Sequence, residues 1–180
     1  MPITEQKIMN FYQVAQARDF TRNFQFRVNQ ILDRGAPVVT PEDLLYVTAA
    51  QLPAREVNNI TVPYMGLTFN VPGAATYPGS GGYTLTFRSD SEQIIRRVFE
   101  NWQRSIFDDQ TSAGTYKIFS TSRVVLDLLN QNFATSRQYV LHGVWPQSVG
   151  AMSYALDGDG SVLTFDVTIA YQFWTRGITQ

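Results

Sequence analysis

The sequence predicts a mainly β fold of the α+β class, in which one helix packs against β-structure. Several stretches alternate apolar and polar residues with a period of two, which is typical of half-buried strands. One long stretch, 91–107, instead repeats its apolar residues every three to four positions, as an amphipathic helix does. Aromatic residues make up 13% of the 180-residue chain, a share that favours β-rich packing.

The predicted strands follow one another from the first third of the chain onward. The first is 24–29, where Phe24, Phe26 and Val28 alternate with polar side chains. A second stretch, 44–53, ends in a proline. Two further strands, at 67–71 and 83–88, flank a connection rich in Pro and Gly at 72–82.

Other stretches complete the outline. Residues 5–18 predict a short helix, and the turn-rich segment 33–43 predicts a loop. The segment 123–131 fits a helix and a strand equally well. In 163–174 the alternation is the most regular in the chain and predicts one long last strand, which the turn-forming residues 157–161 precede. No linker divides the chain, so we expect a single domain over 1–180, with an N-terminal extension at 1–18 and a body at 19–176.

The predicted helix has two distinct faces. Its apolar face consists of Ile94, Ile95, Val98, Phe99, Trp102 and Ile106. Asp90 and Gln93, three residues apart at its start, resemble a capping box. Arg96, Arg97 and Arg104 lie on the other face, which we interpret as solvated or in contact with another subunit.

A Trp-Pro pair separates two predicted strands near the C-terminus. Pro146 cannot donate a hydrogen bond to a sheet, so it belongs at an edge or a corner. Proline also holds the residue before it, Trp145, in extended geometry. With Gly150, these residues are expected to shape a corner of the fold, and we assign Trp145 no role in ligand binding.

Composition excludes several classes of function. The net charge is −1, which gives no basic patch for tight binding of nucleic acid or of a membrane surface. The chain has no cysteine, hence no disulfide and no thiol chemistry. No apolar run reaches transmembrane length, and the start of the chain does not look like a signal peptide.

Motifs of catalysis and cofactor binding are equally hard to find. The single histidine, His142, lies in a predicted strand, where a structural role is far more common than a catalytic one. The segment 157–161 lacks the later glycine and glutamate of a calcium loop, and 79–82 lacks the Lys-Ser/Thr of a phosphate loop. The sequence therefore predicts neither an enzyme nor a cofactor.

Four stretches, in order, resemble the tail tube proteins of contractile-tailed, T-even-like bacteriophages. They are ARDFTRNFQFRVN (17–29), TAAQLPAREVNNITVPYMG (48–66), YTLTFRSDSEQIIRRVFENWQ (83–103) and LHGVWPQSVGAMSYALDGDGSVLTFDVTIAYQFW (141–174). The last is the most specific, because it combines Gly-x-Trp-Pro, Val-Gly and a final strand that ends in an aromatic residue and Trp. Each motif alone is weak, and their order and spacing carry the resemblance.

The resemblance implies an antiparallel β-sandwich or barrel-like subunit with a flanking helix, which forms hexameric rings that stack into a hollow tube. It implies a virion protein, assembled in the host cytoplasm, that conducts DNA inside a contractile sheath. The expected partners are further copies of the chain, the tail sheath protein, baseplate tube-initiator proteins and a tail terminator, with transient, non-specific passage of DNA and no membrane insertion.

Within this framework, two sets of residues are expected to form surfaces of the tube. The long segment 55–80 carries more apolar residues than a small core needs, so it predicts contacts between subunits through Arg55, Val57, Ile60, Val62, Tyr64, Met65 and Tyr77. The polar sides of the inner strands predict the lumen, with candidates Gln25, Arg27, Asn29, Thr84, Thr86, Arg88, Asp166, Thr168 and Gln172. A period of two does not reveal which face points inward.

Two alternatives stay open at this point. The N-terminal extension and the loop at 33–43 are long for a simple tube protein, as in a baseplate tube initiator, and inner-tube proteins of related injection or type VI secretion systems share the expected fold. A monomeric β-barrel that binds a small ligand is the alternative from another class, and it predicts a stable monomer with an apolar cavity.

Overall fold

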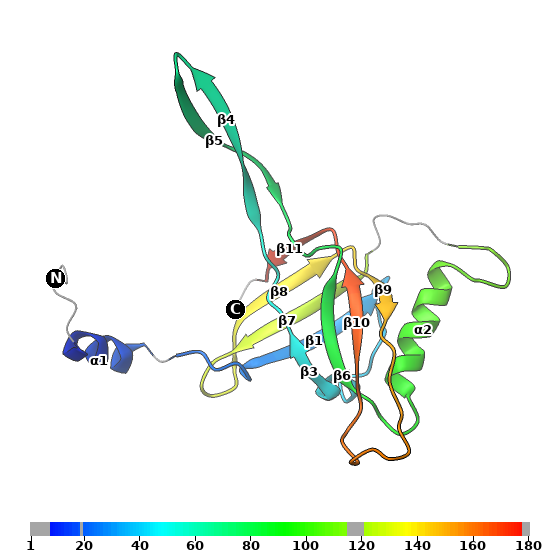
Figure 1. Cartoon of the computed structure of the whole chain (residues 1–180). Coiled ribbons are helices and arrows are strands. Elements are labelled where there is room, and N and C mark those ends of the chain that lie inside the picture. Colours follow the sequence, from blue (N-terminus) through cyan, green and yellow to red (C-terminus); the bar gives the residue numbers. More distant parts are fainter. Residues whose placement is uncertain (1–7, 19, 115–120, 178–180) are drawn as a thin grey trace.

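A computed structural model describes residues 8–18, 20–114 and 121–177. It is mainly β with antiparallel sheets and two α-helices in the described part, as the sequence predicts (Figure 1). The elements are α1 (Ile8–Ala17), β1 (Phe26–Asp33), β2 (Ala36–Pro37), a 3-10 helix η1 (Asp43–Tyr46), β3 (Val47–Ala50), β4 (Glu56–Tyr64), β5 (Leu67–Thr76), β6 (Tyr83–Arg88), α2 (Ile94–Ile106), β7 (Arg123–Leu129), β8 (Thr135–His142), β9 (Trp145–Val149), β10 (Thr164–Ala170) and β11 (Phe173–Arg176). Among the described residues, no helix combines the length and apolarity that crossing a bilayer requires.

Two sheets enclose the core. One has five strands in the order β11-β8-β7-β1-β2, and the other has four in the order β3-β6-β10-β9. Their facing sides supply fully buried residues such as Ile31, Leu85, Val124 and Val167. The segment 123–131, whose sequence fits a helix and a strand equally well, contains the buried strand β7.

The first strands differ in detail from the sequence prediction. Phe24 lies before β1 and is 58% exposed, whereas its neighbour Gln25 is buried and accepts a hydrogen bond from the Arg22 amide. A register shift between Val28 and Gln30 then breaks the strict alternation of β1. In the predicted strand 44–53, the first residues form η1 instead, so that β3 begins at Val47.

The predicted last strand is in fact two strands in different sheets. The chain bends at Tyr171 and Gln172, so β10 belongs to the four-stranded sheet and β11 to the five-stranded sheet. The strand pair beside it bends at Gly143, between β8 and β9. One long hairpin therefore turns a corner and joins the two sheets, a recurrent way of closing a sandwich.

The Trp-Pro pair lies directly after this corner. Pro146 stands in β9, the edge strand of its sheet, beside a register shift in β10. Trp145 is half-buried, and the Gly150 amide donates to the Asp166 carbonyl at 2.6 Å just beyond β9. The segment 157–161 lies in the long connection between β9 and β10, so it turns the chain there without forming a tight hairpin.

Helix α2 extends the core beside β9. Ile95, Phe99 and Trp102 are buried, and the Phe99 ring lies 5.4 Å from that of Phe87 in β6. The predicted capping box is wrong. Asp90 does accept a hydrogen bond from the Ile94 amide, but Gln93 adopts φ +53° and its side chain donates to the Tyr154 hydroxyl.

Candidate assembly surfaces

Strands β4 and β5 form a hairpin, called the arm below, that projects from the sandwich (Figure 1). Its two-residue turn is Met65-Gly66, with φ of +48° and +83°, as tight hairpins with two positive φ values require. The connection predicted at 72–82 starts later, because β5 continues to Thr76. No residue between Glu56 and Tyr77 carries a charge.

The arm has one apolar face. Paired residues of an antiparallel hairpin share a face, and three such pairs are entirely apolar: Ile60 with Val71, Val62 with Phe69, and Tyr64 with Leu67. The other face carries the pairs Thr61 with Asn70 and Pro63 with Thr68. All six apolar residues are 40–66% exposed in the isolated chain. A two-stranded hairpin is marginal in water by itself, and an exposed apolar face of this kind is typical of surfaces that contact another protein.

Most of the predicted subunit contacts lie on the arm. Ile60, Val62 and Tyr64 are on the apolar face, Met65 is in the turn, and Val57 and Arg55 are exposed near the base. Tyr77 instead packs against the body, where its ring meets Trp174. Leu67, Phe69 and Val71 were missing from that prediction, although their alternation marks them as one side of a strand.

Five of the predicted lumen residues share the outer face of the four-stranded sheet. In the register of β6 and β10, Thr84 pairs with Thr168 and Thr86 with Asp166, and Arg88 continues the same face. The Thr86 hydroxyl donates to the Asp166 carboxylate at 2.6 Å. The surface is made of short hydroxyl side chains with one charge of each sign.

The other four predicted lumen residues do not join that face. Arg27 and Asn29 lie in the five-stranded sheet, where both donate to the carboxylate of Asp127 at 2.8 and 3.1 Å. Gln25 is buried and Gln172 occupies the corner. The nine residues therefore cannot line one lumen together, because the two sheets turn their outer faces in opposite directions.

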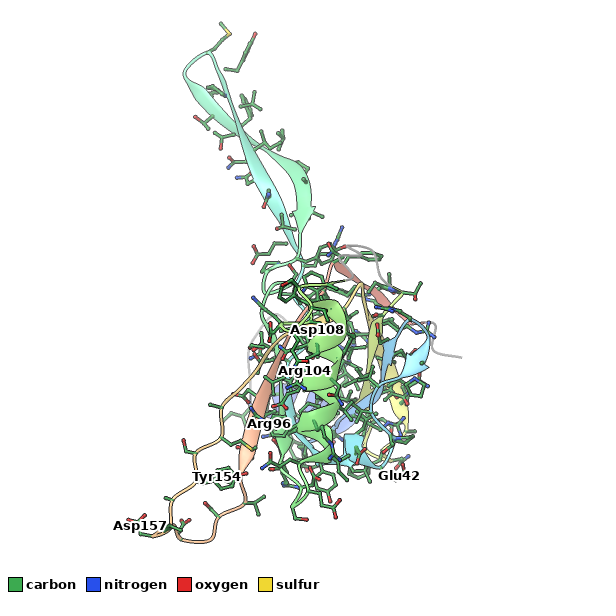
Figure 2. The ribbon with its side chains drawn as sticks, turned by 90° about the vertical axis from the view of Figure 1, so that its right-hand side faces the viewer. Glu42, Arg96, Arg104, Asp108, Tyr154 and Asp157 are labelled. Carbon is green, nitrogen blue, oxygen red and sulfur yellow. The ribbon has the colours of Figure 1, made fainter. Side chains whose placement is uncertain are left out.

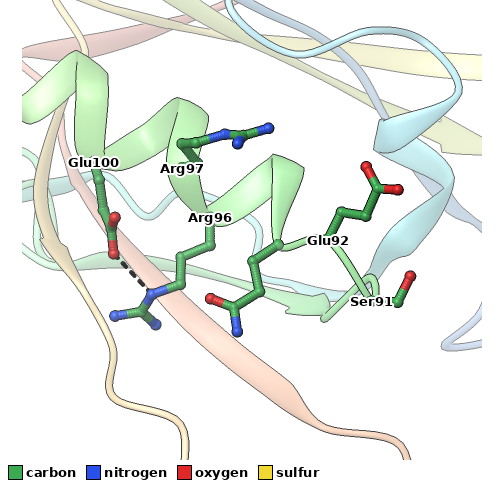
Figure 3. A pocket seen from close by; sticks show the side chains of 6 residues that line it. Ser91, Glu92, Arg96, Arg97 and Glu100 are labelled. Carbon is green, nitrogen blue, oxygen red and sulfur yellow. Dashed lines mark hydrogen bonds and ion pairs between the residues drawn. The ribbon is translucent and has the colours of Figure 1, made fainter.

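Helix α2 presents a charged side at the surface. Arg96 is not free there, since it bonds to Glu100 at 2.8 Å (Figure 3). It also donates to the Gly150 carbonyl at 2.6 Å. Together with Ser91, Glu92, Gln93 and Arg97, these two side chains line a shallow surface depression. The mixed charges give no basic patch for nucleic acid.

The single histidine has a packed setting. His142 stacks on Phe173 with ring centroids 4.8 Å apart and shares a hydrogen bond with the Thr175 hydroxyl. Partial burial and the nearby Arg123 lower the pKa of His142 below its ordinary value, so the neutral form prevails at pH 7.

A sandwich with an uncovered apolar arm and a hydroxyl-lined sheet defines a protein that acts by assembling with other chains. The model of the phage tail tube protein family matches residues 10–177, and the chain belongs to this family. The tail tube protein gp19 of Enterobacteria phage T4 is 27% identical over 128 residues, which cover 70% of this chain and 77% of that protein.

Two further proteins show similarity. The baseplate tail-tube junction protein gp54 of phage T4 is 30% identical over 95 residues, 52% of this chain and 29% of that protein. The tube-terminating cap of the anti-feeding prophage has the same fold, with a TM-score of 0.64 and 14% identity over 99% of this chain and 100% of that chain. The chain is thus a structural subunit of a contractile phage tail tube and a component of the virion. This family decides against the monomeric ligand-binding barrel.

Proposed function

We propose that this chain forms hexameric rings that stack into the hollow conduit through which DNA passes, inside a contractile sheath. The observation that carries the proposal is the apolar face of the arm, which no other described residue of the chain buries. Covering it with a further copy removes about 25 cal/mol of unfavourable free energy per Å² of apolar surface withdrawn from water. We infer that the arm bridges to a neighbouring subunit.

The wall of the conduit is the four-stranded sheet in this proposal. In the described part of the chain, its two edge strands, β3 and β9, each pair with one strand, so copies placed side by side in a ring can continue the sheet. The lumen set then narrows to Thr84, Thr86, Arg88, Asp166 and Thr168. A lumen of hydroxyl groups and balanced charges lets DNA slide, because tight binding needs phosphate neutralisation.

Cysteine labelling distinguishes the two outer faces. The chain has no cysteine, so Thr84→Cys and Thr175→Cys each create one labelling site, on the four-stranded and the five-stranded sheet respectively. In assembled tubes we expect Thr84→Cys to lose most of its reaction with a maleimide on a bulky polymer, while Thr175→Cys keeps it. A small maleimide controls for thiol reactivity. If both cysteines in assembled tubes react equally with the polymer maleimide, the assignment of the four-stranded sheet to the lumen is wrong.

The proposed partners beyond the chain itself are the sheath protein, a baseplate tube initiator, a tail terminator and DNA in transit. The similarity to a baseplate junction protein supports a second candidate function. In it, the chain is a tube initiator, which forms a single ring on which the tube starts. Negative-stain electron microscopy and solution mass of the purified protein test both. Long open tubes support the main tube subunit, and rings that never elongate support the initiator. A protein that stays monomeric even when a baseplate is supplied contradicts both.

A further inference from the structure

The direction of the arm depends on how its base is held. The arm has no core of its own and leaves the sandwich at one end, opposite the connection that carries Asp157 (Figure 2). A hinge at the base would let the apolar face point in many directions. The apparent affinity of binding then falls in step with the fraction of subunits that hold the competent geometry.

One side chain of the body touches both legs of the arm. The indole Nε1 of Trp174 donates to the Ala54 carbonyl, on the leg that leads into β4, at 2.9 Å. The ring of Tyr77, on the leg that follows β5, meets the Trp174 ring edge-on with centroids 6.4 Å apart. Trp174, in β11, therefore contacts both legs just below the first strand pair of the arm, Glu56 with Thr76.

Trp174 is itself firmly placed. It pairs with Leu141 across β11 and β8, and Leu141 is fully buried, so the indole lies on the core side of the sheet. The ring of Tyr139, also in β8, packs edge-on against it at 5.4 Å. Strand pairing on one side and an aromatic ring on another leave the indole little freedom.

Two other bonds hold the same legs. The Tyr83 hydroxyl donates to the Gln51 carbonyl on the incoming leg, and burial raises the pKa of Tyr83, which keeps this hydroxyl protonated. On the outgoing leg, the Tyr171 amide donates to the Ser80 carbonyl at 2.8 Å. These bonds hold the ends of the legs where they join the body, whereas Trp174 contacts both legs next to the arm.

We propose that Trp174 is a positioning residue, which clamps the two legs of the arm and sets the direction in which its apolar face meets the next subunit. The inference rests on the proposed function of the arm as a subunit interface. Trp174 makes no contact with another copy in this scheme. It acts by removing conformations of the arm that assembly would otherwise have to select against.

Pulsed electron-spin distance measurements test the clamp directly. Spin labels at Thr68→Cys near the arm tip and Asn101→Cys on α2 report the direction of the arm, with labelled protein diluted in unlabelled protein of the same variant. We expect a narrow distance distribution for the native chain and a broad one for Trp174→Ala, with the circular dichroism of the body retained. Phe173→Ala is the matched control, since Phe173 is adjacent on β11 and stacks on His142 instead.

Assembly gives the second readout. If Trp174→Ala leaves about a tenth of the arms in the competent direction, the critical concentration for tubes rises about tenfold. Should this variant fail to fold, Trp174→Phe carries the test, because it keeps an aromatic ring beside Tyr77 and Tyr139 but loses the donor to Ala54, and it is expected to broaden the distances less. An unchanged distribution, or native assembly despite a broad one, overturns the clamp. Native assembly of chains with a charged arm face would instead overturn the proposed role of the arm as a subunit interface, independently of Trp174.

Discussion

Placing two aspartates on the apolar face of the arm, as Val62→Asp with Phe69→Asp, is expected to abolish tube formation while the subunit stays folded. The two residues pair across β4 and β5 and are 43% and 51% exposed, so the body loses no core packing. In an assembled tube the same positions would hold two adjacent buried carboxylates. An unpaired buried charge costs several kcal/mol, and one tube repeats that cost at every subunit.

The opposite face of the arm supplies a matched control. Thr61 and Asn70 form the next pair in the same register, so Thr61→Asp with Asn70→Asp places the same two charges on the polar face. We expect this control to assemble far better than the first variant, as judged by electron microscopy and sedimentation, with both monomers melting alike. Native tubes from the Val62 and Phe69 variant would refute the arm interface. Equal loss in both variants would contradict a one-sided interface.

Periodicity predicted the elements of this fold more reliably than their assembly into sheets. The regular alternation of 163–174 correctly indicates β-structure on both sides of a bend at Tyr171 and Gln172. It contains no sign that Ala170 and Phe173 belong to different sheets, because the bend keeps the alternation while the hydrogen-bond partners change. The nine predicted lumen residues are divided between the two sheets and the corner for the same reason. Arg27 and Thr86 are both polar members of alternating strands, and only long-range pairing separates their sheets.

The exposed apolar segment was easier to anticipate. A run of uncharged residues with alternating apolar side chains exceeded the needs of the core, and the structure leaves it exposed as the arm. Sequence reasoning found Ile60, Val62 and Tyr64 but missed Phe69 on the facing strand, because cross-strand register depends on the Met65-Gly66 turn. It also placed Tyr77 among the contacts, although that ring packs on Trp174 at the base.

The bend at Gly143 is the position where one added methyl group is expected to cost the most. Its φ of +64° disfavours any residue with a Cβ, and that Cβ would lie 2.7 Å from the Gln172 Cγ on the partner strand. Left-handed strain of about 1–2 kcal/mol and overpacking of about 1–3 kcal/mol together lower the free energy of unfolding by about 2–5 kcal/mol for Gly143→Ala. For a chain of this size, the melting temperature then falls by about 5–15 °C.

A double-mutant cycle separates the two causes. Gly160→Ala introduces the same methyl at a φ of +79° with nothing within 4 Å, so it reports the backbone strain alone. Gln172→Ala removes the Cγ that the new methyl would strike, and in its presence we expect Gly143→Ala to cost no more than Gly160→Ala. Calorimetry of the native chain, the two single variants and the double variant measures the coupling free energy between positions 143 and 172. Additive losses would show that the corner tolerates the methyl sterically, and glycine would then be required at the joint between the two sheets for its backbone conformation alone.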